Sequence, residues 1–169
     1  MVDPAYCQLL ARYNRWMNER LYAAAATLGD DERKRDRGAF FGSIHRTLCH
    51  LVWADRAWLA RFLGQPYDAP AYGADLYAEF DELARERERT DTELLAWADH
   101  LTPAWLERRL TYVRKADGRS AHLDAWVAAT HLFSHSIHHR GQVTTLLKQA
   151  GVDPGATDLP WMPGVTALD

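Results

Sequence analysis

The sequence predicts an all-α protein built as a four-helix bundle, and three observations support this fold class. Four segments carry apolar residues at helical spacing. The segments between them are rich in glycine, proline or charge and carry short strands at most. The length of 169 residues fits one domain, 1–169, that is large enough to bury its own core.

The first two helices are expected at residues 4–28 and 43–63. Asp3 followed by Pro4 is a typical start, in which the carboxylate caps the helix and proline fills its first position. A charged stretch with glycine follows and is interpreted as a loop up to Ser43, which can cap the second helix. Gly64 then ends that helix.

The third helix is expected at residues 75–101, opening at Asp75. Its middle, residues 84–93, alternates arginine with acidic residues, which is typical of a solvated helix face with ion pairs three or four residues apart. After a short turn at Pro103, residues 108–123 carry β-branched side chains around a Lys-Ala-Asp-Gly turn. This pattern predicts a short hairpin or extended excursion between the third and fourth helices.

The fourth helix is expected at residues 121–150, starting from Asp124 or, one turn earlier, from Ser120. Gly151 stands in the position where a left-handed residue commonly ends a helix. The C-terminal tail, residues 151–169, is expected to be irregular and to pack through Trp161.

Composition excludes several classes of function. The formal net charge is −3, so there is no basic footprint for nucleic acid. No apolar run approaches the roughly 20 residues that span a bilayer, and the N-terminus lacks the features of a signal peptide. Cys7 and Cys49 show neither disulfide nor zinc-binding spacing. A cytoplasmic protein without membrane or nucleic-acid partners is therefore expected.

The segment from His131 to Gln142 holds four histidines within little more than two helical turns. His135 and His139 are four residues apart, so they stack on the apolar side of the fourth helix. His131 drifts to the margin of that side, and His138 is rotated away from it. Core histidines satisfied by hydrogen bonds are one interpretation of the pair. A shared divalent metal ion is the other, because two buried imidazoles side by side are costly otherwise.

His50, at the edge of the apolar arc of the second helix, is the candidate third ligand; helical geometry permits this without requiring it. Solvent exposure or capping is expected for the remaining histidines, which are His45, His100 and His122.

Asp55 lies inside the same apolar arc as a carboxylate that needs a partner. It can support a ligand imidazole, or it can make a structural contact to Asn14 or Arg140, which we favour. Asn14 and Asn18, one turn apart on the first helix, are expected to form hydrogen bonds between helices.

Four stretches carry a resemblance to a known family. They are YNRWMNERL at 13–21, TLCHLVWADRAWL at 47–59, HSIHHRGQ at 135–142 and GVDPGATDL at 151–159. With these motifs in this order, the chain resembles the DinB-like family of bacterial four-helix-bundle proteins over nearly its whole length. The resemblance implies a DinB-like bundle and a metal ion, often nickel or zinc, held by His50, His135 and His139. It also implies a homodimer, and some members of the family are induced by DNA damage.

Three histidine ligands leave one coordination position open, which is typical of catalytic rather than structural metal sites. The leading hypothesis is therefore a metal-dependent enzyme. Because some relatives use low-molecular-weight thiols, a thiol-dependent transferase, isomerase or hydrolase is the most concrete activity that the resemblance implies. Tyr13, Asp55 and Gln142 are possible pocket residues, but none is assigned a catalytic role.

Two alternatives remain open at this point. In the first, a non-enzymatic stress-response bundle uses the ion only to stabilise its fold. In the second, a metal-free bundle has histidines that sense pH or simply pack.

Overall fold

The structure is a computed structural model that describes residues 2–68, 76–114 and 117–166. Within these ranges the chain is mostly helical, with a small two-stranded sheet. The long helices are α1 (Pro4–Ala26), α3 (Ile44–Leu63), α4 (Phe80–Asp99) and α6 (Ala125–Gln149). The shorter elements are α2 (Asp30–Lys34), α5 (Pro103–Leu106), β1 (Arg109–Val113), β2 (Ser120–Asp124) and the 3-10 helix η1 (Leu159–Trp161).

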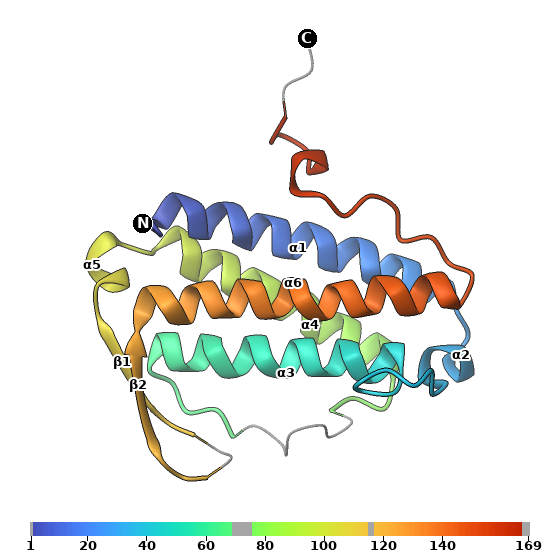
Figure 1. Ribbon diagram of the computed structural model, residues 1–169, viewed down its shortest axis with the longest axis horizontal. Coiled ribbons are helices and arrows are strands. Elements are labelled where there is room, and N and C mark those ends of the chain that lie inside the picture. Colours follow the sequence, from blue (N-terminus) through green and yellow to red (C-terminus); the bar gives the residue numbers. More distant parts are fainter. Residues whose placement is uncertain (1, 69–75, 115–116, 167–169) are drawn as a thin grey trace.

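The four long helices pack around a common interior. Helix α1 contacts α4 and α6, and α3 contacts the same two helices. Figure 1 shows α6 in front of α4, with α1 above and α3 below. Strands β1 and β2 pair antiparallel, from Arg109 opposite Asp124 to Val113 opposite Ser120, and lead directly into α6. The prediction of a mostly helical chain with a hairpin before the last long helix is confirmed.

Local sequence signals set most helix ends as predicted. The side chains of Asp3 and Ser43 accept backbone hydrogen bonds from the first turns of α1 and α3, and Pro4 opens α1. Gly64 ends α3 with a φ of 64°, and Gly151 follows α6 with a φ of 81°. These values lie in the left-handed region that glycine adopts without steric cost.

Some expected boundaries are wrong. Residues 30–34, expected as part of a loop, form α2, whose acidic first turn and basic last turn complement the helix dipole. Helix α4 begins at Phe80, with Glu79 as an N-cap that makes no side-chain hydrogen bond. The expected start at residue 75 lies outside the described residues. Ser120 starts no helix, because residues 120–124 pair with β1, and α6 begins only at Ala125.

The predicted turn of the hairpin lies partly outside the described residues, at 115–116. On its far side Gly118 has a φ of 68°, and its backbone N–H donates to the carbonyl of Arg114. This conformation fits the glycine of the expected turn.

The tail after α6 does not pack through Trp161, whose side chain is 68% exposed. It is held to α1 by polar contacts instead. The Tyr13 hydroxyl donates to the backbone carbonyl of Thr157, and the Arg20 guanidinium donates to that of Pro154. The expectation about Trp161 was wrong because other side chains make the apolar contacts of this segment: Met162 is 6% exposed, and Val152 packs against one of the apolar clusters of the interior.

The interior contains two apolar clusters, one at each end of the long helices. One cluster holds residues such as Leu10, Leu59, Leu94 and Leu132. The other includes Met17, Leu48, Leu83 and Val143. In sequence, each helix crosses from one cluster to the other through buried polar residues, which therefore form a layer between the two.

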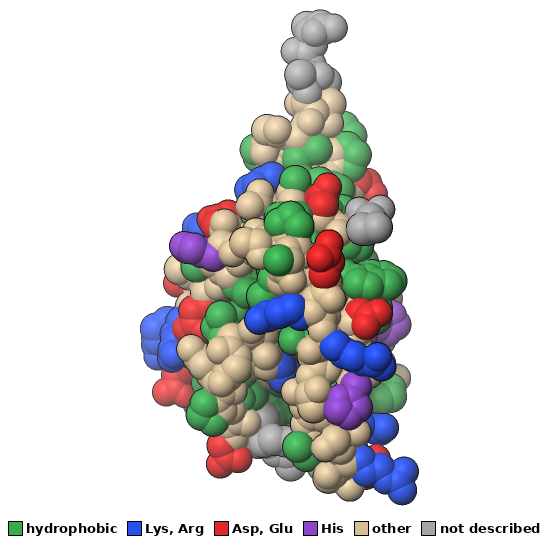
Figure 2. Space-filling model, turned by 90° about the vertical axis from the view of Figure 1, so that its left-hand side faces the viewer, with side chains coloured by type: hydrophobic (Ala, Val, Ile, Leu, Met, Phe, Trp, Pro, Cys, Tyr) green, Lys and Arg blue, Asp and Glu red, His purple; other side chains and the backbone are tan. Residues whose placement is uncertain are grey.

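On the face shown in Figure 2, basic and acidic side chains are interspersed. None of the helices in the described part of the chain is long and apolar enough to cross a membrane.

Candidate metal centre

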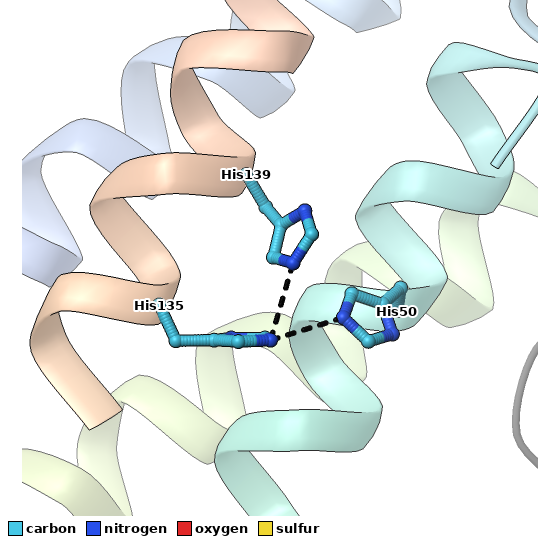
Figure 3. Close-up of side chains that lie close together, drawn as sticks. All are labelled: His50, His135 and His139. Carbon is cyan, nitrogen blue, oxygen red and sulfur yellow. Dashed lines mark hydrogen bonds between the residues drawn. The ribbon is translucent and has the colours of Figure 1, made fainter. Parts of the chain in front are cut away.

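The structure brings three of the histidines together in the interior (Figure 3). His50 comes from the first half of α3, and His135 and His139 come from successive turns of α6. One ligand-capable atom of each ring lies within 4.8 Å of the corresponding atoms of the other two. His50 and His139 are buried, at 5% and 8% exposed, while His135 is half-buried.

The three rings point their Nε2 atoms toward one another. Nε2 of His135 lies 3.2 Å from Nε2 of His50 and 3.1 Å from Nε2 of His139. Two nitrogens bound at 2.0–2.1 Å to one tetrahedral ion are about 3.3 Å apart. The spacing therefore suits ligands of a single ion, and it suits hydrogen bonds between neutral rings as well.

All three imidazoles favour the neutral form that binds metals. Burial, followed by the neighbouring imidazoles, lowers the pKa of His50 to about 3 and that of His135 to about 4. Burial also lowers the pKa of His139. Because all three rings are neutral, binding of an ion at this position would release no net proton at neutral pH.

Aromatic rings and an amide surround the centre. Phe41 stacks on His50 with ring centroids 4.1 Å apart, and its centroid is 5.4 Å from that of His139. His139 Nδ1 lies 2.8 Å from Oε1 of Gln142. Nδ1 of His135 is buried and finds no hydrogen-bond partner among the described residues.

The other histidines lie outside the centre. His131 and His138 lie away from the converging nitrogens, as predicted, and both are exposed, although His131 packs edge-on against Trp58. His100 and His122 are exposed as well. The expectation for the first-turn histidine of α3 was wrong. His45 is 2% exposed, and its Nε2 lies 2.7 Å from the backbone carbonyl of Tyr77, so a segment distant in sequence covers it.

Asp55 is a structural partner, as favoured, but not of the residues expected. Its carboxylate accepts hydrogen bonds from Arg87 at 2.8 Å and from Ser136 at 2.8 Å. Ser136 directly follows His135 on α6. The contact therefore ties α3 and α4 to α6 directly beside His135.

The rest of the polar layer continues from Arg87. A second ion pair joins Arg87 to Asp91 at 2.9 Å, and Asn18 donates to the same carboxylate at 2.9 Å. Arg140 donates to Asn14, which in turn reaches Asp91 at 3.3 Å. The two asparagines thus connect helices, as predicted.

The interpretation of residues 84–93 as a solvated face was wrong in part. Arg89 and Glu93 do form an exposed pair, but Arg87 is 2% and Asp91 4% exposed. A signal for this exists in the sequence, because both residues share the helical spacing of Leu83 and the other apolar residues of α4. Because both side chains are charged, this spacing was interpreted as that of an exposed helix face.

The fold and the centre together define a mostly helical protein with a three-histidine cluster that could hold a metal ion. A family model described as "DinB family" matches residues 1–167, so the chain belongs to the DinB family. It is 22% identical over 161 residues to Protein DinB of Bacillus subtilis (strain 168), an alignment that covers 88% of each chain.

A solved structure shares the fold. It is that of a DinB-like protein from Bacillus cereus ATCC 10987, with a TM-score of 0.62 and 19% identity. The similarity covers 83% of this chain and 89% of that one.

Proposed function

We propose that His50, His135 and His139 bind one divalent metal ion, nickel or zinc, through their Nε2 atoms. The convergence of three neutral imidazoles from two helices supports this most strongly, with contacts of 3.1 and 3.2 Å. Imidazole is a good ligand for both metals. Hydrogen bonds alone account for the cluster less well, because Nε2 of His135 offers either one hydrogen or one lone pair but contacts two neighbouring nitrogens, at 3.1 and 3.2 Å.

The architecture that carries this centre is, in our proposal, a four-helix bundle of the DinB-like type, formed by residues 1–169 as one domain. The mutual packing of α1, α3, α4 and α6 supports it, and so does a family match that extends over residues 1–167.

The proposed activity is that of a metal-dependent enzyme, a thiol-dependent transferase or hydrolase acting on a low-molecular-weight thiol or its adduct. An ion held by three histidines keeps a position for water or for a substrate thiolate, whose pKa it lowers. The chain's own thiols are unsuited to this role. Cys7 and Cys49 are buried, and burial raises the pKa of Cys7 to about 11. The reacting thiol would therefore be an external one.

A structural ion without turnover is the second candidate. The Phe41 ring favours it, because it stacks on His50 and closes one side of the centre. The two candidates differ in whether an external ligand reaches the ion.

Metal titration of untagged, chelator-stripped protein tests the proposed site. We expect one ion per chain. His139→Ala removes a ligand and should weaken metal binding by more than roughly 100-fold, which is the most that loss of a residue hydrogen-bonded to a ligand usually costs. His122→Ala removes an exposed histidine from β2 and serves as the control, with unchanged affinity. Equal affinity in the wild type and in His139→Ala would refute the site.

Cobalt-substituted protein separates the enzyme from the structural alternative. A small thiol that reaches the ion should add a thiolate-to-cobalt absorption band, and the band should be lost in His139→Ala. A cobalt spectrum that does not respond to thiol would favour the structural alternative.

Two copies of the chain associate, in our proposal, as a homodimer. Exposed apolar side chains on α1 and the tail support this, among them Tyr6 at 44%, Trp161 at 68% and Val165 at 38%. A surface cavity of about 500 Å³ between Leu9 and Val165 lies in the same region. Sedimentation analysis should give twice the chain mass, and a monomer at micromolar concentration would contradict the proposal.

A further inference from the structure

Gln142 contacts the candidate centre from the side opposite the converging nitrogens. It follows His139 by three residues on α6, and its Oε1 lies 2.8 Å from Nδ1 of His139. An amide oxygen can only accept a hydrogen bond. Nδ1 of His139 is therefore the donor and carries the hydrogen, which leaves Nε2 of the same ring with its lone pair.

A second contact orients the amide of Gln142. Its Nε2 faces Nε2 of His138 at 3.4 Å, on the exposed side of α6. In this orientation the amide donates to His138 and accepts from His139. Both contacts of the amide are satisfied in this orientation, with Nδ1 of His139 as donor and Nε2 of His138 as acceptor.

The arrangement has a consequence inside the cluster. Since Nε2 of His139 carries a lone pair, its 3.1 Å contact with Nε2 of His135 requires a hydrogen on His135. His135 then has its own lone pair on Nδ1, the buried atom without a partner among the described residues. A bare acceptor, rather than an N–H group, thus occupies that position in the metal-free protein.

We propose that Gln142 is a positioning residue of the centre, which holds His139 in the Nδ1–H form and so presents its Nε2 lone pair to the ion. This inference rests on the proposed metal site. Ligand histidines commonly donate their second ring nitrogen to a fixed acceptor, which sets the tautomer and orients the ring. His139 is the ligand for which the structure provides such an acceptor on its own helix.

The tautomer can be measured without any metal. Long-range ¹H–¹⁵N correlation spectra of the metal-free protein report which ring nitrogen of His139 carries the hydrogen. We expect Nδ1–H in the wild type, a shift of population toward Nε2–H in Gln142→Leu, and Nδ1–H again in Gln142→Glu, whose carboxylate also accepts. Gln149→Leu makes the same change at an exposed position at the end of α6 and should leave His139 unaltered.

Metal affinity of the same four proteins provides the second measurement. We expect Gln142→Leu to bind nickel or zinc about 10- to 100-fold more weakly. Gln142→Glu and Gln149→Leu should bind at least as tightly as the wild type.

The outcomes separate this inference from the proposed function. Three results would each overturn the role of Gln142. The first is a wild type in which His139 carries its hydrogen on Nε2, and the second is a tautomer of His139 that does not change in Gln142→Leu. The third is an equal loss of metal affinity in Gln142→Leu and Gln142→Glu. If the proteins show the expected tautomers but the wild type binds no metal, the proposed function is refuted. The positioning of His139 by Gln142 is then still supported.

Discussion

The buried guanidinium of Arg87 should be essential for stability, although it lies in a stretch rich in exposed charge. Arg87 is 2% exposed and pairs with Asp55 at 2.8 Å and with Asp91 at 2.9 Å. Arg87→Met fills much of the same space but leaves two buried carboxylates without their cation. Breaking a buried ion pair from one side costs about 3 to 5 kcal/mol. For a chain of this size, that corresponds to a fall in Tm of about 6 to 20 °C.

The pH dependence of this loss identifies its cause. Burial raises the pKa of Asp91, while Arg87 lowers it, so removal of Arg87 raises the folded-state pKa further. The folded variant then binds more protons than the unfolded chain, and its stability increases as the pH falls through that raised pKa. The deficit relative to the wild type should therefore be larger at pH 8 than at pH 5.

Urea denaturation followed by circular dichroism measures both effects. Arg89→Met is the matched control on the same helix, because Arg89 is exposed and its pair with Glu93 should contribute less than about 1 kcal/mol. Equal losses for Arg87→Met and Arg89→Met, or a deficit that does not change with pH, would refute the argument for a buried ionic layer.

Two further predictions concern the histidine centre. The metal-free protein should lose stability as the pH falls from 7.5 to 5.5. His50 and His135, with pKa values of about 3 and 4, stay neutral when folded but take up protons when unfolded. Each contributes about 1.4 kcal/mol of this loss at pH 5.5, so His135→Phe should show a smaller difference between the two pH values in urea titrations. An identical pH dependence in the two proteins would contradict the lowered pKa. Phe41→Ala should accelerate removal of bound metal by a chelator, because the ring stacked on His50 no longer covers it; an unchanged rate of removal would show that Phe41 does not shield the centre.

Helix ends were predictable where a short motif determines them. The Asp3 and Pro4 pair and the Ser43 cap act through contacts within one turn, so the sequence contains the whole interaction. The start of α4 lacks such a motif. Its N-cap, Glu79, makes no side-chain hydrogen bond, and the helix begins where the core contacts of Phe80 begin.

The histidine pair on α6 was predictable from helical spacing, whereas the contribution of α3 was not. His135 and His139 are four residues apart, but His50 lies 85 residues before His135, and only tertiary packing brings the two rings to 3.2 Å. The same reason explains why Arg87 was misinterpreted. Its partner Asp55 is 32 residues away on another helix, and an arginine without a visible partner is expected to be exposed.

Anomalous X-ray diffraction at the metal absorption edge, from crystals of untagged protein, tests the central claim most directly. We expect one peak between α3 and α6, about 2.0 to 2.1 Å from Nε2 of His50, His135 and His139. An ion bound elsewhere, or bound through Nδ1 of any of these rings, would contradict it.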